Sequence, residues 1–70
     1  MKSLELKAEI ARSGYTAKSL AAVIGMPTQT LSNKIAGKTE FKGSEITAIA
    51  RMLNLNISQV NQIFFDGKVN

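Results

Sequence analysis

The chain has 70 residues, a formal net charge of +4 and neither cysteine nor histidine. This length accommodates one domain and no second core, so we expect residues 1–70 to form a single domain. Because Cys and His are absent, the chain can form no disulfide and no thiolate metal site, and it lacks the commonest general base. We therefore expect no enzyme, no cofactor and no metal. Its apolar runs are far shorter than the ~20 residues that span a bilayer, and Met1–Ile10 lacks the pattern of a signal peptide. We therefore expect a cytoplasmic protein without membrane contact.

The excess positive charge falls in one part of the chain. Acidic and basic residues balance in residues 1–11 and again in residues 43–70. Between these segments Glu40 is the single acidic residue, whereas the basic residues are Arg12, Lys18, Lys34, Lys38 and Lys42. Such a cluster indicates a nucleic-acid partner. The alternative is a solvated face that keeps a small protein in solution.

Apolar residues at helical spacing predict five short helices and no strands. The helices are expected over about residues 3–13, 16–24, 28–36, 44–53 and 58–65. Ser3 and Thr16 are candidate N-caps, and Gly14, Gly25 and Gly37 follow the first three helices, where glycine favours termination. Helices of this length are unstable alone, so tertiary packing must hold them in one all-α bundle.

The C-terminal half is expected to complete the core. Phe41, in the loop after the third helix, is expected to fold back as an anchor. Phe64 and Phe65 are adjacent and cannot both face one core. We expect one to pack inside and the other to be left for a partner, with a harmless exposed aromatic as the alternative.

Residues 16–37 carry the most informative pattern, two short helices joined by a tight turn. Ala21 is small enough for two helices to cross, and Gly25 can take the positive φ of the turn. The next helix opens with short polar side chains, Thr28, Gln29 and Thr30. This layout is typical of a helix-turn-helix, in which the second helix lies in the major groove of DNA.

Three segments of the chain resemble the lambdoid phage Cro and repressor family. They are Leu20-Ala21-x-x-x-Gly25-Met26, Thr30–Ile35 and Gly37-Lys38. The tail from Ile57 to Phe65 looks like the last helix of small prophage Cro-like proteins, so the resemblance covers nearly the whole chain. It implies a lambda-repressor-like five-helix domain that binds palindromic double-stranded DNA operators as a dimer. It also implies a short transcriptional regulator, in which the third helix reads the DNA.

Carried onto this sequence, the resemblance implies two sets of DNA contacts. The base-contacting residues would be Thr28, Gln29, Ser32 and Asn33, with Gln29 able to pair with adenine N6 and N7. The phosphate-contacting residues would be Ala17, Lys18, Lys34, Lys38, Thr39 and Lys42. The C-terminal helix, through Phe64 and Phe65, would form a weak homodimer contact.

Two positions depart from the family pattern. Ala17 stands where many members carry a phosphate-contacting glutamine, and Pro27 stands where a capping Ser or Thr is usual. Proline suits the first helical turn, but the third helix could then start one residue away from the expected place. The sequence therefore leaves open which of residues 28–30 faces the bases, and whether Thr28 only caps the helix.

The polar residues of the expected DNA contacts could also have no role in binding. Gln29 and Asn33 could be ordinary surface residues, and Lys38 and Lys42 ordinary loop lysines. The alternative function is an antirepressor-like modulator that binds a partner repressor rather than DNA. It is left open by the modest net charge, by Ala17 and by the apolar end at Phe64-Phe65. Neither the operator nor the choice between repression and activation can be obtained from the sequence.

Overall fold

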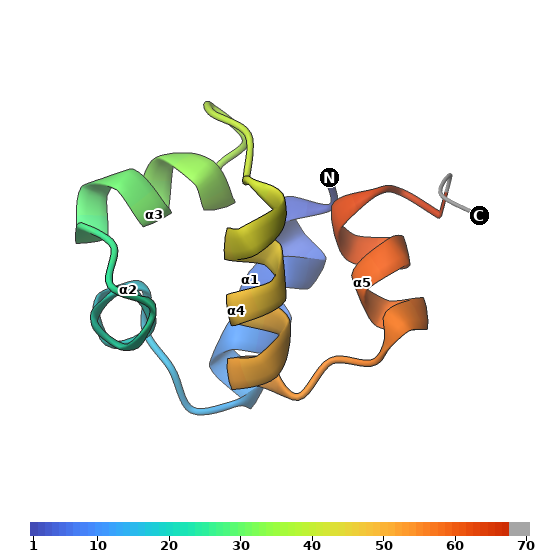
Figure 1. Ribbon diagram of the computed structural model, residues 1–70, viewed down its shortest axis with the longest axis horizontal. Helices are drawn as coiled ribbons and strands as arrows, with labels where there is room; N and C mark the ends of the chain where they lie inside the picture. The colour runs from blue at the N-terminus through green and yellow to red at the C-terminus, as the bar shows by residue number, and fades with distance from the viewer. Residues whose placement is uncertain (68–70) are drawn as a thin grey trace.

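A computed structural model describes residues 1–67 of the chain, and this part contains five α-helices and no strand (Figure 1). Their bounds are α1 Ser3–Arg12, α2 Ala17–Ile24, α3 Thr28–Ile35, α4 Gly43–Leu53 and α5 Ile57–Phe64. The all-α, five-helix prediction is confirmed. None of the helices in residues 1–67 is long and apolar enough to cross a membrane.

The helices are arranged around α4, which runs through the middle of the molecule in Figure 1. Helices α2 and α3 lie on one side of α4, α5 lies on the other, and α1 lies behind it. The principal extents are 31 × 23 × 21 Å, so every helix reaches one shared core. That core consists of Leu6, Ile10, Leu20, Ala21, Leu31, Ile35, Ile49, Leu53, Ile63 and Phe64.

Local capping explains where most helices begin. Thr16 is the N-cap of α2 as predicted, since its side chain accepts a hydrogen bond from the Ser19 N–H and Ser19 Oγ accepts from the Thr16 N–H. Asn56 and Gln59 make the same reciprocal pair at the start of α5, one residue earlier than expected. The Asn-x-x-Gln spacing could have located this start from the sequence.

The predicted N-cap Ser3 is wrong, because Ser3 is already the first residue of α1 and Lys2 stands at the cap position. The Lys2 N–H donates to the Ile63 carbonyl oxygen at 2.8 Å, which joins the start of the chain to α5. The Met1 ammonium also pairs with Asp66 at 2.9 Å. Contacts with the distant end of the chain therefore set this helix start in place of a side-chain cap.

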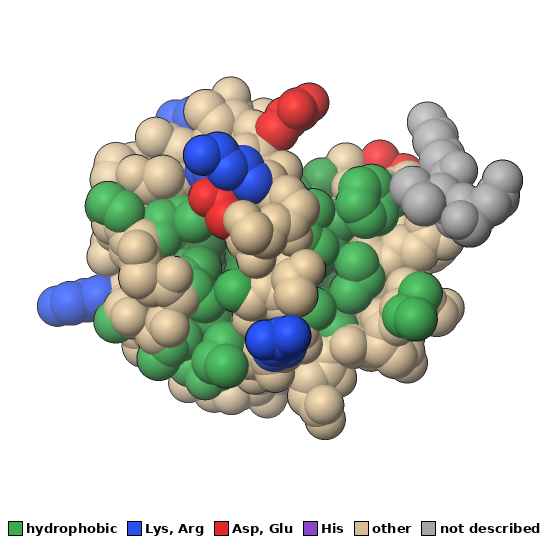
Figure 2. Space-filling view, viewed as in Figure 1, with side chains coloured by type: hydrophobic (Ala, Val, Ile, Leu, Met, Phe, Trp, Pro, Cys, Tyr) green, Lys and Arg blue, Asp and Glu red, His purple; other side chains and the backbone are tan. Residues whose placement is uncertain are grey.

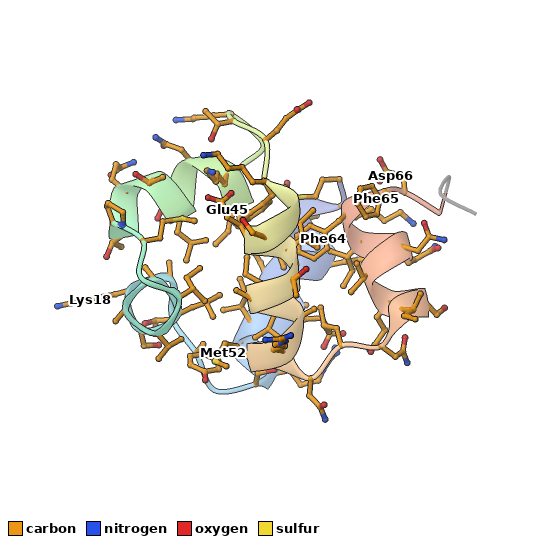
Figure 3. All side chains as sticks on the ribbon, viewed as in Figure 1. Lys18, Glu45, Met52, Phe64, Phe65 and Asp66 are labelled. Atoms are coloured by element: carbon orange, nitrogen blue, oxygen red, sulfur yellow. The ribbon has the colours of Figure 1, made fainter. Side chains whose placement is uncertain are left out.

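The structure tests both predictions made for the phenylalanines. Phe64 is in the core and meets the half-buried Phe41 edge to face, with ring centroids 5.4 Å apart. Phe65 keeps 40% of its surface exposed (Figure 3). The expectation that Phe41 anchors its loop, and that one of the two adjacent phenylalanines packs inside, is confirmed.

Candidate functional site

Helices α2 and α3 are joined by a turn of three residues, Gly25, Met26 and Pro27. Gly25 has φ +73°, the left-handed conformation expected for it, and the Met26 N–H donates to the Ala21 carbonyl at 2.9 Å. Ala21 is 1% exposed, so the small residue lies where the helices meet. The turn geometry predicted from the small residue and the glycine is therefore present.

Pro27 occupies the cap position of α3 with φ −58°, and Thr28 is the first helical residue. No side-chain hydrogen bond caps this helix, so Thr28 does not act as its cap. The start expected from the sequence is confirmed, without the one-residue shift that Pro27 left open.

The outer face of α3 is polar and uncharged. Leu31, Lys34 and Ile35 are its buried residues, which places Gln29 and Asn33 on the opposite side of the helix. Thr28, Gln29 and Thr30 are exposed, and Asn33 is half-buried. The Gln29 Nε2 donates to the Asn33 Oδ1 at 3.0 Å, so the two amides are joined across one helical turn.

Ser32 lies to the side of this face rather than at its centre. It lines a groove of about 420 Å³ together with Thr16 and Ala17 from the start of α2 and residues of α1. The structure thus brings Ser32 and Ala17, two of the predicted site residues, to the same groove. The backbone N–H groups at Ala17 and Lys18 have no acceptor within the helix, as at any helix start.

Lys34 is placed differently from the expectation that it contacts phosphate. Its side chain is 10% exposed, and its Nζ donates to the Glu45 Oε1 at 2.6 Å. The same carboxylate oxygen accepts the Lys42 N–H at 2.7 Å. Lys34 packs inward at the end of α3 because Leu31 and Ile35 share its side of the helix, and α4 supplies its counter-ion (Figure 3).

These contacts lower the pKa of the Glu45 carboxyl below its ordinary value of 4.5. The hydrogen bond from Lys34 is the largest cause, followed by the backbone N–H of Lys42, and both outweigh the opposing effect of burial. Glu45 thereby joins the end of α3 to the start of α4. The sequence carried no signal for this pair, because the two residues are on different helices.

The remaining predicted cations are accessible. Lys18, Lys38 and Lys42 are exposed, and none of the ion pairs found within residues 1–67 includes their side chains. Lys18 extends away from α2 in Figure 3. Lys38 and Thr39 follow the end of α3, where Gly37 takes φ +84° and the Lys38 N–H donates to the Asn33 carbonyl. Arg12, by contrast, pairs with Glu9 on its own helix.

Within residues 1–67, no cluster of three or more His, Cys, Asp or Glu side chains could hold an ion. The acidic residues that are close to cations serve ion pairs, as Glu45 and Glu9 do.

The fold and this surface define a small five-helix domain with a tight α2–α3 turn and a polar outer face on α3. The chain belongs to a family described as protein of unknown function DUF739, whose sequence profile matches residues 3–67. No curated protein and no solved structure matches the chain. The family description carries no activity, so function has to be argued from the surface itself.

Proposed function

We propose that the protein is a sequence-specific DNA-binding transcriptional regulator, similar to the Cro and repressor proteins of phages and prophages. In this proposal α2 and α3 act as a helix-turn-helix and α3 enters the major groove. One observation carries the proposal: the exposed face of α3 is polar and uncharged, and in the chain it is flanked by exposed lysines, Lys18 on α2 and Lys38 and Lys42 after α3.

This distribution suits the two tasks of a DNA-binding surface. Amide and hydroxyl groups can read base edges, whereas lysines contact phosphates without sequence preference. Thr28, Gln29 and Asn33 are the proposed base-contacting residues, with Ser32 beside them at the groove with Ala17. Lys18, Lys38, Thr39 and Lys42 are the proposed phosphate contacts. Lys34 is not among the proposed phosphate contacts, because it forms an ion pair with Glu45.

The proposed regulator acts as a dimer on a palindromic operator. Two copies would place their α3 helices about 34 Å apart, one turn of DNA. Phe65, directly after α5, is the proposed dimer residue, since it is exposed and Phe64 belongs to the core. A homodimer that is weak without DNA is consistent with one exposed aromatic per copy.

A second candidate function is a modulator that binds a partner repressor. Three exposed apolar side chains on α4, α5 and the turn after α5 favour it, since Met52 is exposed by 41%, Ile57 by 89% and Phe65 by 40%. Figure 2 shows hydrophobic side chains at the surface over this part of the molecule. An exposed apolar surface of this kind is typical of protein contacts.

Selection from a random duplex pool, followed by sequencing, tests the leading proposal. We expect enrichment of a palindrome whose half-sites are centred about one helical turn apart. Retention of no duplex at low salt, together with tight binding to a repressor in size-exclusion runs, would favour the modulator instead.

A further inference from the structure

The side chains of Gln29 and Asn33 are coupled before any ligand is present. Both residues lie on the outer face of α3, four positions apart, and Gln29 Nε2 donates to Asn33 Oδ1 at 3.0 Å. A hydrogen bond at this spacing restricts the rotamers of both side chains. It also gives each amide a defined direction, with the Asn33 oxygen turned toward Gln29.

The coupling decides which groups remain for a ligand. A primary amide carries two N–H donors and one oxygen acceptor. Gln29 gives one N–H to Asn33 and keeps its oxygen and a second N–H. Asn33 keeps both of its N–H groups, and its oxygen, which has one lone pair left, is turned toward Gln29. Gln29 therefore presents a mixed donor and acceptor edge, and Asn33 presents mainly its N–H groups because its oxygen is turned toward Gln29.

These two edges match different bases in the major groove. Adenine offers N6 as donor and N7 as acceptor, which fits the oxygen and the remaining N–H of Gln29. Guanine offers two acceptors, N7 and O6, which fit the two N–H groups of Asn33. Cytosine presents its N4 donor, which the N–H groups of Asn33 cannot bind. Thymine supplies a single acceptor, O4, and fits Asn33 less completely than guanine.

We propose that Gln29 and Asn33 form one specificity-determining unit that reads two adjacent base pairs, adenine through Gln29 and guanine through Asn33. The spacing supports adjacency, because the joined amide atoms are 3.0 Å apart and successive base pairs rise by about 3.4 Å. The inference rests on the proposed DNA-binding function and adds to it the bases and the dependence of one contact on the other.

Duplex selection with four proteins tests the unit: the unaltered chain, Asn33→Ala, Asn33→Asp and the control Thr30→Ala. Thr30 is exposed on the same helix, and no hydrogen bond of its side chain is found within residues 1–67. The unaltered chain is expected to enrich adenine and guanine at neighbouring positions, by about tenfold each over the other bases. Thr30→Ala is expected to keep both preferences.

The two Asn33 variants separate a coupled unit from two independent contacts. Asn33→Ala frees the Gln29 amide, so the preference is expected to weaken at both positions. Asn33→Asp still accepts from Gln29 but has lost its donors, so guanine is expected to give way to cytosine while adenine is kept. The carboxylate also repels phosphates, and this lowers affinity on all sequences alike.

A measurement without DNA accompanies the selection. In the free protein, Asn33→Ala is expected to shift the NMR signals of the Gln29 side-chain amide, and Thr30→Ala is not. Unchanged Gln29 signals, or a preference lost at one position only in Asn33→Ala, would overturn the coupled unit while leaving DNA binding intact. Retention of no duplex by the unaltered chain would overturn the proposed function and the inference together.

Discussion

Lys34 of α3 and Glu45 of α4 form an ion pair of 2.6 Å, with the two side chains 10% and 20% exposed. The Glu45 carboxylate also accepts the Lys42 N–H at the start of α4. One acidic group therefore links the end of α3, the loop that carries Lys38 and the next helix. In the proposed function this link fixes the orientation of α3 relative to the lysines that follow it.

Replacing Glu45 with glutamine is expected to destabilise the domain by about 1–3 kcal/mol, because Lys34 would stay largely buried without a counter-ion. Thermal unfolding followed by circular dichroism measures the change. Glu9→Gln is the matched control, since it breaks a pair whose arginine is 68% exposed. The control is expected to cost about 0–1 kcal/mol. Equal losses in the two variants would show that the Lys34–Glu45 pair contributes no more to stability than the exposed Arg12–Glu9 pair.

The lowered pKa of Glu45 predicts a stability that depends on pH. The folded-state pKa lies below the ordinary value of 4.5, so the unfolded chain takes up the proton first as the pH falls. The stabilisation is complete above that ordinary value and is lost as the pH falls through the lower folded-state pKa. Melting curves between neutral pH and pH ~3 should show a smaller acid-induced loss for Glu45→Gln than for the unaltered chain. Parallel pH profiles would contradict this assignment.

The helices could be predicted from the sequence because their signals are local. Apolar spacing and glycines placed all five, and the small Ala21 with Gly25 located the α2–α3 turn. The predicted cap of α1 and the predicted starts of α4 and α5 were each one residue off. At α1 the Lys2 N–H bonds to Ile63, and at α4 the Glu45 side chain accepts from Lys42. The α1 contact is made with a distant part of the chain, and the α4 contact is half of a capping box whose cap residue is a lysine rather than Ser, Thr, Asp or Asn.

The candidate site was predictable to a lesser degree. The spacing of Gln29 and Asn33 placed them on one face, but their mutual hydrogen bond depends on side-chain rotamers. Lys34 was counted as a free cation because its partner lies eleven residues away, on another helix. Charge counted along the chain therefore overstates the accessible positive charge of residues 12–42, in which Lys18, Lys38 and Lys42 are the exposed lysines.

Gly25→Ala is expected to destabilise the α2–α3 turn by about 1–2 kcal/mol, because an L side chain disfavours the left-handed conformation. The φ of Gly25 is +73°, and no atom lies within 4 Å of the place a Cβ would take, so the cost is conformational. Gly43→Ala is the matched control, since Gly43 is in α4 and a Cβ there also meets open space. The control is expected to be neutral or slightly stabilising. Chemical denaturation measures both, and a neutral Gly25→Ala would refute strain at the turn.

Lys38→Ala is expected to weaken binding to all duplexes alike and to reduce the slope of log K against log salt by about 1. The reason is the loss of one phosphate contact beside α3. Arg51→Ala is the control, because Arg51 is an exposed cation on α4 that lines a groove with residues of α4 and α5. Fluorescence anisotropy over a salt series gives both slopes. A slope reduced equally by the two variants would mean that overall charge, rather than this surface, governs binding.

Phe65→Ser is expected to weaken self-association while leaving the fold intact. Phe65 is 40% exposed, and its polar replacement removes apolar surface from the proposed dimer contact without opening the core, which Phe64 fills. Sedimentation velocity over a concentration series measures the dimer, and thermal unfolding at low concentration confirms the fold. Leu4→Ser is the control, since Leu4 is 80% exposed on α1. If Leu4→Ser dissociates the dimer and Phe65→Ser does not, the contact lies at α1 and the assignment to Phe65 is wrong.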